Sequence, residues 1–234
     1  MELSIYASII VTLPYYAYLA YEDWKKREID SKAFYSAIPF VIAVNYANFV
    51  SYGIPVLVND IVALISFATI LILSHLGLMG RGDSFIISFI FLLNPYPIFF
   101  VGIPIFPGFA ITMLSFLYPL YIIFRNVYVN AKNIEIFKNL TERSGKISKL
   151  YYFLFGETMR REEFEKKKFY FPLVSSGMKR LHANMELDPL SPEKYKIEGK
   201  YLIASFGIPM AFAIFIGYIL FLVSLLLGFS RPFF

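Results

Sequence analysis

Two aspartates in this chain each lie at the edge of a long uncharged run. Asp23 follows residues 3–21 in the segment YEDWKKREID, and Asp83 precedes residues 84–124 in the segment GLMGRGDSFI. Two carboxyl groups about 3 Å apart cannot both ionise, so one keeps a proton while its partner is charged. The charged group can take a proton from a water molecule, and the protonated group can donate to a peptide carbonyl oxygen. If the fold brings these side chains together, they can hydrolyse a peptide bond.

The composition argues against several other chemistries. The 234 residues include no cysteine, which excludes a cysteine nucleophile, a thiolate metal site and a disulfide framework. With only two histidines, a multi-histidine metal site is not expected. We therefore expect neither a metal nor another cofactor.

The aspartates must be positioned by membrane helices. Hydrophobic residues make up 58% of the chain, charged residues 17%, and the mean hydropathy is +0.60, whereas soluble domains are about 25% charged. One crossing needs about 20 mostly apolar residues. The uncharged runs predict an all-α membrane protein with six transmembrane helices, at about residues 3–21, 34–52, 56–75, 83–99, 103–124 and 202–228.

The side chains within these helices give two further expectations. Asn45 and Asn48, in the second helix, are expected to form hydrogen bonds between helices. Pro209, in the segment FGIPMAF of the last helix, is expected to kink that helix.

One soluble insert is predicted between the fifth and sixth helices. Residues 125–201 hold 16 Lys and Arg against 10 Asp and Glu. Residues 1–124 would carry the first five helices and both aspartates, and residues 202–234 the last helix and the C-terminus. Within the insert, MRREEFEKKKFYF (159–171) indicates a charged helix attracted to anionic lipid headgroups rather than to nucleic acid.

The basic residues predict the orientation in the membrane. Lys25, Lys26 and Arg27 follow the first helix, so this end faces the cytoplasm and the N-terminus lies outside the cell membrane. Six crossings then place three segments on the cytoplasmic side, and together they hold 21 of the 22 basic residues: 22–33, 76–83 and 125–201. Both aspartates fall on the cytoplasmic side, which the positions of Lys and Arg alone define.

Glycines surround the second aspartate. Gly80 and Gly82 precede Asp83 where a helix should begin, at a cost of about 0.5–1 kcal/mol each. Glycine there allows another backbone, such as an extended substrate peptide, to approach closely, and an N-cap aspartate would not need it. Arg81-Gly82-Asp83 also matches a cell-adhesion tripeptide, but adhesion requires residue 81 outside the cell, opposite to the side predicted from charge.

These features resemble the GxGD membrane aspartyl proteases, and within them the archaeal preflagellin peptidases, relatives of bacterial type IV prepilin peptidases. The resemblance covers most of the chain: its length, six helices, EDWKKREID after the first helix and GRGD before the fourth. It implies that Asp23 and Asp83 are the catalytic pair and that Gly80 and Gly82 are the motif glycines. It also implies preflagellin or prepilin-like substrates, whose short basic leader is removed at the cytoplasmic face.

The chain departs from the bacterial enzymes in two respects. Their insert is usually rich in cysteine, and they usually have Ile-Pro after the first aspartate, where this chain has Ile29-Asp30. No methyl-donor site is evident, so the methyltransferase activity of the bacterial enzymes is not carried over.

A proton- or cation-coupled transporter that uses Asp23 and Asp83 is the alternative function. Such a transporter predicts acidic residues near the middle of the membrane and a repeat between two halves of the chain. Here both aspartates are predicted at one edge, and the sequence shows no repeat.

Overall fold

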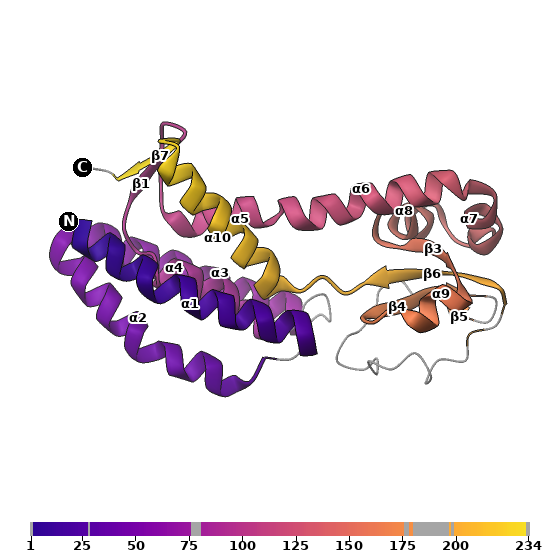
Figure 1. Ribbon diagram of the computed structural model, residues 1–234, viewed down its shortest axis with the longest axis horizontal. Coiled ribbons are helices and arrows are strands. Elements are labelled where there is room, and N and C mark those ends of the chain that lie inside the picture. The colour runs from indigo at the N-terminus through magenta and orange to yellow at the C-terminus, as the bar shows by residue number, and fades with distance from the viewer. Residues whose placement is uncertain are drawn as a thin grey trace. The chain divides into compact units, whose positions relative to one another are not determined.

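The computed structural model describes residues 2–27, 29–75, 81–175, 178–179, 197 and 199–232, most of them helical (Figure 1). The chain forms two compact units. Unit 1 comprises Met1–Tyr118 and Pro209–Phe234, and unit 2 comprises Pro119–Ile208.

Unit 1 is a helical bundle with one small sheet. Its strands form an antiparallel sheet in the order β2-β1-β7. Its elements are α1 (Glu2–Lys26), α2 (Ser31–Tyr52), α3 (Ile54–His75), α4 (Arg81–Leu92), β1 (Ile98–Phe100), β2 (Ile103–Ile105), α5 (Pro107–Ser115), α10 (Met210–Leu226) and β7 (Ser230–Pro232).

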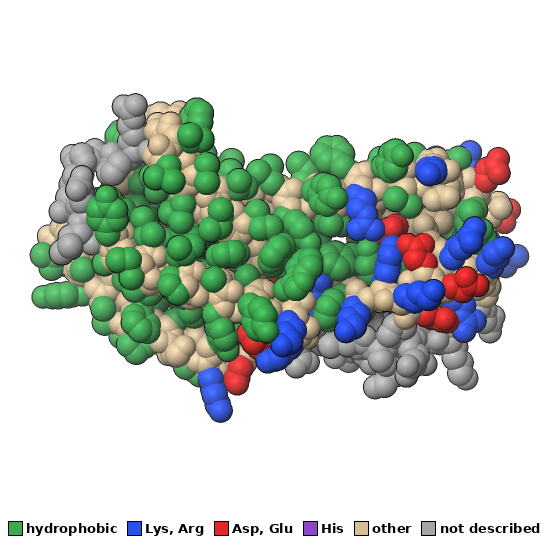
Figure 2. All heavy atoms as spheres, viewed as in Figure 1, with side chains coloured by type: hydrophobic (Ala, Val, Ile, Leu, Met, Phe, Trp, Pro, Cys, Tyr) green, Lys and Arg blue, Asp and Glu red, His purple; other side chains and the backbone are tan. Residues whose placement is uncertain are grey.

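Three stretches of the described chain are long and apolar enough to cross a membrane: Ser31–Tyr52, Ile54–Ile72 and Pro107–Lys132. Two further helices, α4 and α10, are apolar but shorter. Hydrophobic side chains dominate the face of unit 1 shown in Figure 2. These properties support a membrane protein, as predicted from composition.

Local signals explain how α2 is bounded. Asp30 lies at its N-cap, and the carboxylate accepts a hydrogen bond from the N–H of Lys32 at 2.9 Å. At the other end Gly53 has φ 68° and donates its N–H to Phe49 at 2.8 Å. This left-handed conformation favours glycine and lets the chain turn directly into α3.

Side-chain hydrogen bonds fix the directions of α1 and α4. The hydroxyl of Tyr16 donates to the carbonyl of Ile86, and the amide of Asn94 donates to the hydroxyl of Thr12 at 3.5 Å. From the first bond to the second, the residue number falls along α1, whereas the number of the bonded residue rises along α4 and the residues after it. The helices α1 and α4 are therefore antiparallel. The end of α1 therefore lies at the same end of unit 1 as the beginning of α4.

The C-terminal end of α4 is held by amides from three asparagines. A helix leaves its last four carbonyl groups without helical partners, and in an apolar environment these need other donors. The three side-chain amides donate to three successive carbonyls: Asn45 to Leu92 at 2.6 Å, Asn59 to Phe91 at 3.0 Å and Asn94 to Ile90 at 3.0 Å. These bonds allow a helix of only 12 residues to end inside the bundle.

The expected interhelical bonds of two asparagines are confirmed. Asn45 joins α2 to α4 through Leu92, and Asn48 donates to the hydroxyl of Ser8 in α1 at 3.4 Å.

A close helix contact joins α5 to α10 at Gly217. A Cβ atom there would lie 2.5 Å from the carbonyl oxygen of Ile111 and 2.7 Å from the backbone nitrogen of Ser115. Backbone atoms cannot move aside as a flexible side chain can, so this approach requires glycine. Small residues at such contacts are typical of helix packing in membranes.

Unit 2 contains a four-stranded antiparallel sheet, in the order β3-β6-β4-β5, packed with short helices. Its two apolar clusters centre on Leu173 and on Phe164, both of them fully buried. The elements are most of α6 (Leu117–Lys132), then α7 (Ile134–Thr141), α8 (Lys146–Phe155), β3 (Glu157–Arg160), α9 (Arg161–Lys166), β4 (Tyr170–Ser175), β5 (Met178–Lys179) and β6 (Tyr201–Phe206).

The prediction of a purely α-helical chain was therefore wrong, because the chain also forms two small sheets. The fourth predicted helix, 83–99, ends at Leu92, because Pro95 and Pro97 have no N–H to donate and Pro95 disfavours a helical conformation at Asn94. A hairpin follows, whose turn residues Val101 and Gly102 have φ 50° and 80°. Positive φ at both turn positions matches the right-handed twist of paired strands.

The predicted beginning of the last helix, 202–228, was also wrong, because α10 begins at Met210. Residues Tyr201–Phe206 form strand β6, which pairs with β3 and β4. Hydropathy could not separate this apolar strand from the apolar helix that follows it. Pro209 therefore does not kink a helix; it stands at the N-cap of α10.

The asparagine cap of α4 can be tested with Asn59→Leu, which keeps much of the side-chain volume but removes the donor to Phe91. We expect a loss of about 0.5–1.5 kcal/mol in the free energy of unfolding, because the buried carbonyl of Phe91 loses one of its two donors and keeps only the N–H of Asn94 at 3.1 Å. Thermal unfolding in detergent measures it, with Ser51→Ala, an exposed helix position, as the control. Equal melting temperatures for Asn59→Leu and the wild type would contradict this role.

Candidate active site

Asp23 is held against the beginning of α10. Its side chain is 8% exposed, and Oδ2 accepts a hydrogen bond from the N–H of Ala211 at 2.8 Å. The N–H of Phe212 donates to the same carboxyl group. These two donors are the second and third residues after the Pro209 cap, which are the groups that an N-cap side chain normally satisfies.

The sequence explains why α10 uses a carboxylate from another helix. Pro209 has no side-chain oxygen or nitrogen, so it cannot cap α10 itself. The first N–H groups of the helix are then left without partners, and they carry a partial positive charge. Asp23 supplies both the acceptor and the opposite charge, and this contact ties the end of α1 to the beginning of α10.

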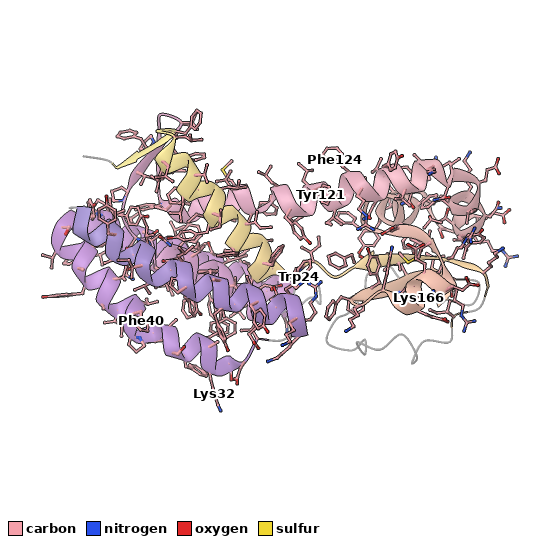
Figure 3. The ribbon with its side chains drawn as sticks, in the orientation of Figure 1. Trp24, Lys32, Phe40, Tyr121, Phe124 and Lys166 are labelled. Atoms are coloured by element: carbon pink, nitrogen blue, oxygen red, sulfur yellow. The ribbon has the colours of Figure 1, made fainter. Side chains whose placement is uncertain are left out.

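Aromatic rings cover this contact. The ring of Trp24 lies 4.7 Å from that of Phe212, and Tyr118 packs edge-on to Phe212 at 5.5 Å. Figure 3 shows Trp24 at the end of α1, beside the first turn of α10. The rings limit the access of water to Asp23 and contribute to its burial.

Burial raises the pKa of the Asp23 carboxyl above its ordinary value. The N–H groups of Ala211 and Phe212 and the positive charge of Arg27 act in the opposite direction, but burial dominates. Arg27 lies just past the last residue of α1 and has φ 61°, a left-handed conformation that ends the helix. Asp23 therefore keeps a proton to higher pH than a solvated aspartate.

Asp83 lies in the first turn of α4 and is half-buried. A negative charge at this position interacts favourably with the N-terminal end of the helix dipole. Nearby, the ring of Phe34 at the beginning of α2 stacks on Phe85 at 5.2 Å. The helix start that carries Asp83 is thus packed against α2.

The two aspartates lie at the same end of unit 1. Asp23 is seven residues beyond Tyr16 on α1, and Asp83 is three residues before Ile86 on α4. Because α1 and α4 are antiparallel and Tyr16 bonds to Ile86, a rise of about 1.5 Å per residue puts the two residues within about 6 Å of one level. The contacts that hold Asp23 come from α10, however, and α4 is fixed by α2 and α3.

The glycine prediction has a mixed outcome. Gly80 lies outside the described residues. At Gly82, an added Cβ would meet the Phe34 ring at 3.9 Å, an ordinary contact distance. Among the described residues there is therefore room for a side chain at Gly82, and their packing does not require glycine there.

Sequence reasoning missed the residues that surround Asp23. Trp24, Ala211 and Phe212 were not singled out, although a proline directly before an apolar run is a signal for a helix start. Among the residues that the structure describes, no three His, Cys, Asp or Glu side chains are grouped as metal ligands would be. The groups that the structure places at this site are the Asp23 carboxyl and the N–H groups of Ala211 and Phe212.

An apolar groove of about 430 Å³ lies between α1 and α2. It is lined on α1 by Pro14, Tyr15 and Tyr18, one to three turns before Asp23, and on α2 by Ala37 and Phe40 (Figure 3). Such a groove suits apolar side chains or an acyl chain.

The raised pKa of Asp23 predicts how stability depends on pH. The folded protein binds this proton more tightly than the unfolded chain does, so the resulting stability is complete below about pH 3.9 and is lost as pH rises through the folded-state pKa. The asparagine in Asp23→Asn does not titrate. The melting temperature of this variant should therefore rise relative to that of the wild type as pH increases from acidic to neutral. Thermal unfolding across this range measures the trend, with Asp30→Asn as the exposed control. A difference that does not change with pH would contradict it.

Comparison with known proteins adds no relative: no protein-family model matches the chain, and no curated protein or solved structure is significantly similar to it.

Proposed function

We propose that this protein is an integral-membrane aspartic endopeptidase that removes the short basic leader from preflagellin or type IV prepilin-like precursors at the cytoplasmic face. The observation that carries the proposal is that Asp23 and Asp83 lie at the same end of unit 1, on two antiparallel helices that are hydrogen-bonded to each other. The resemblance of EDWKKREID and GRGD to the GxGD proteases supplies the substrate class.

The chemistry follows from two unequal carboxyl groups. Asp23 is buried with a raised pKa, which suits a group that donates a proton to the carbonyl oxygen of the scissile peptide. Asp83 is half-buried in the first turn of α4, and in this proposal it takes the proton from the attacking water. The water oxygen bonds to the carbonyl carbon, and the C–N bond then breaks as the amine leaves with a proton.

Substrate binding completes the pair in this proposal. The Asp23 carboxyl accepts from the first turn of α10, so pairing with Asp83 requires a movement at the end of α1 or at the beginning of α4. A peptide lying across Gly82 would meet little steric resistance, because that position has no side chain. The apolar groove between α1 and α2 can receive apolar residues of the precursor.

The proposed topology has six crossings, with the N-terminus outside and residues 125–201 in the cytoplasm. It is supported by the antiparallel course of α1 and α4 and by the concentration of 21 of 22 basic residues in the three segments assigned to one side. The short helices α4 and α10 would cross together with the adjoining sheet of unit 1. Both aspartates would then face the compartment where unprocessed precursors are made.

The catalytic assignment is tested with Asp23→Asn and Asp83→Asn. Asparagine at position 23 keeps an oxygen that accepts from Ala211, so it preserves the cap of α10 while removing the titrating group. We expect each variant to lose leader cleavage by at least about a thousand-fold, because groups that act as one unit fail together. Incubation with a preflagellin followed by gel analysis measures this, and Asp30→Asn is the matched control. Processing at the wild-type rate by either variant would end the proposal.

The role of Gly82 is tested with Gly82→Ala. The added methyl group has room beside Phe34, so the free energy of unfolding should change by no more than about 1 kcal/mol. Cleavage should nevertheless fall, because the methyl group obstructs the substrate backbone. Thermal unfolding and the cleavage assay on the same preparation separate the two effects. Full activity would show that this glycine is not needed for substrate approach.

A further inference from the structure

Within unit 2, helix α6 buries polar side chains. Asn126 and Asn130 are both buried and lie one turn apart. Asn126 donates to the carbonyl of Leu154 at 3.1 Å, and Asn130 donates to Phe153 and Gly156 at 2.9 and 2.7 Å. The inward face of this part of α6 is therefore polar and forms hydrogen bonds to the end of α8.

The outward face of the same helix is aromatic. Tyr121 is 62% exposed, Phe124 65% and Tyr128 70%. Their spacing of three and four residues puts them on one stripe, and Figure 3 shows Tyr121 and Phe124 on the same side of α6. A helix in water has the opposite arrangement, with its apolar face inward.

Helix α8 presents a second apolar stripe. Ile147 is 84% exposed, Leu150 60% and Phe155 40%. Because Asn126 and Asn130 bind the end of α8, the two stripes belong to neighbouring helices. In Figure 2 hydrophobic side chains follow the upper edge of unit 2 over α6, whereas charged side chains gather around α9 and β4.

Positive charge accompanies the apolar stripe on α8. Residues 132–149 contain five basic side chains (Lys132, Lys138, Arg143, Lys146 and Lys149) against two acidic ones (Glu135 and Glu142). Anionic lipid headgroups attract such clusters. Tyrosines are also typical of the boundary between lipid and water, and α6 carries two of them on its outward face.

We propose that the face of unit 2 formed by the outward stripes of α6 and α8 lies in the interfacial region of an anionic phospholipid bilayer. Three observations carry this assignment: aromatic side chains outward and asparagines inward on α6, the exposed apolar stripe of α8, and the basic residues beside it. Helix α6 is also the second part of the stretch Pro107–Lys132, which is long and apolar enough to cross a membrane. The proposal is independent of peptidase activity.

The chain has no cysteine, so single cysteines can be introduced into the full protein without a background of native thiols. Ile147→Cys and Leu150→Cys would carry an environment-sensitive fluorophore on α8. Lys166→Cys on α9 is the comparison in the same unit, and it also tests the segment 159–171, which the sequence assigned to lipid headgroups and the present proposal assigns to water (Figure 3). The protein is placed in nanodiscs that contain phosphatidylglycerol, and fluorescence is quenched either by brominated lipid or by aqueous iodide.

Labels at positions 147 and 150 should emit at shorter wavelength and be quenched by brominated lipid, while the label at position 166 is quenched by iodide. Equal iodide quenching at all three positions would mean that the face is in water and would overturn the proposal. Protection of positions 147 and 150 from both quenchers would also overturn it, because a protein partner or a second copy of the chain would then cover the face.

The contribution of charge is measured separately. Lys146→Gln together with Lys149→Gln, added to Ile147→Cys, should reduce quenching by brominated lipid in phosphatidylglycerol nanodiscs and have less effect in purely zwitterionic ones. The same change in both lipids would show that these lysines do not recognise anionic headgroups.

Discussion

The structure of unit 1 depends on one constraint: backbone polar groups inside an apolar bundle must find partners within the protein. Long helices such as α2 and α3 meet it through their own hydrogen bonds, but short helices expose unsatisfied ends. The C-terminal carbonyls of α4 are bound by three asparagine amides, and the first N–H groups of α10 are bound by Asp23. Both short helices can therefore end within the bundle only because neighbouring helices supply side chains of the right kind.

This constraint gives Asp23 a structural role beside its proposed catalytic one. As an acceptor it fixes α10 against α1, and that contact needs only an oxygen at the right place. As an acid it is buried beside Trp24 and Phe212, and burial shifts its proton equilibrium upward. The packing that holds the helix is thus the same packing that raises the pKa of the Asp23 carboxyl. Substitution by asparagine separates the two roles because it retains the acceptor.

The sequence predicted the parts of this arrangement that depend on local pattern. The uncharged runs located helices α2 and α3 to within a few residues, and polar residues within an apolar run correctly indicated bonds from Asn45 and Asn48 to other helices. The number of predicted crossings between Asp23 and Asp83 also places the two residues on the same side of the membrane, in agreement with their position at the same end of unit 1. The roles of these two residues in catalysis stay a prediction.

The parts that could not be predicted depend on contacts between distant residues. Asp23 and Ala211 are 188 positions apart, and no local pattern relates them. The strand β6 was hidden because apolar residues in a sheet and in a membrane helix have the same hydropathy, and only its pairing with β3 and β4 distinguishes it. Likewise the space beside Gly82 is set by where Phe34 lies, which the sequence around the glycine does not encode.

The need of buried polar groups for partners within the protein applies to both units. Apart from Asp23, the buried polar residues of unit 1 are asparagines, serines and threonines, among them Asn48 and Asn59, which bond to a side chain and to a helix carbonyl of other helices. Helix α6 repeats this pattern with Asn126 and Asn130, which bond to the end of α8. A chain that puts asparagine inward and phenylalanine outward has adapted that surface to lipid rather than to water. In the proposal above, the aromatic side of α6 is therefore the part of unit 2 that meets lipid.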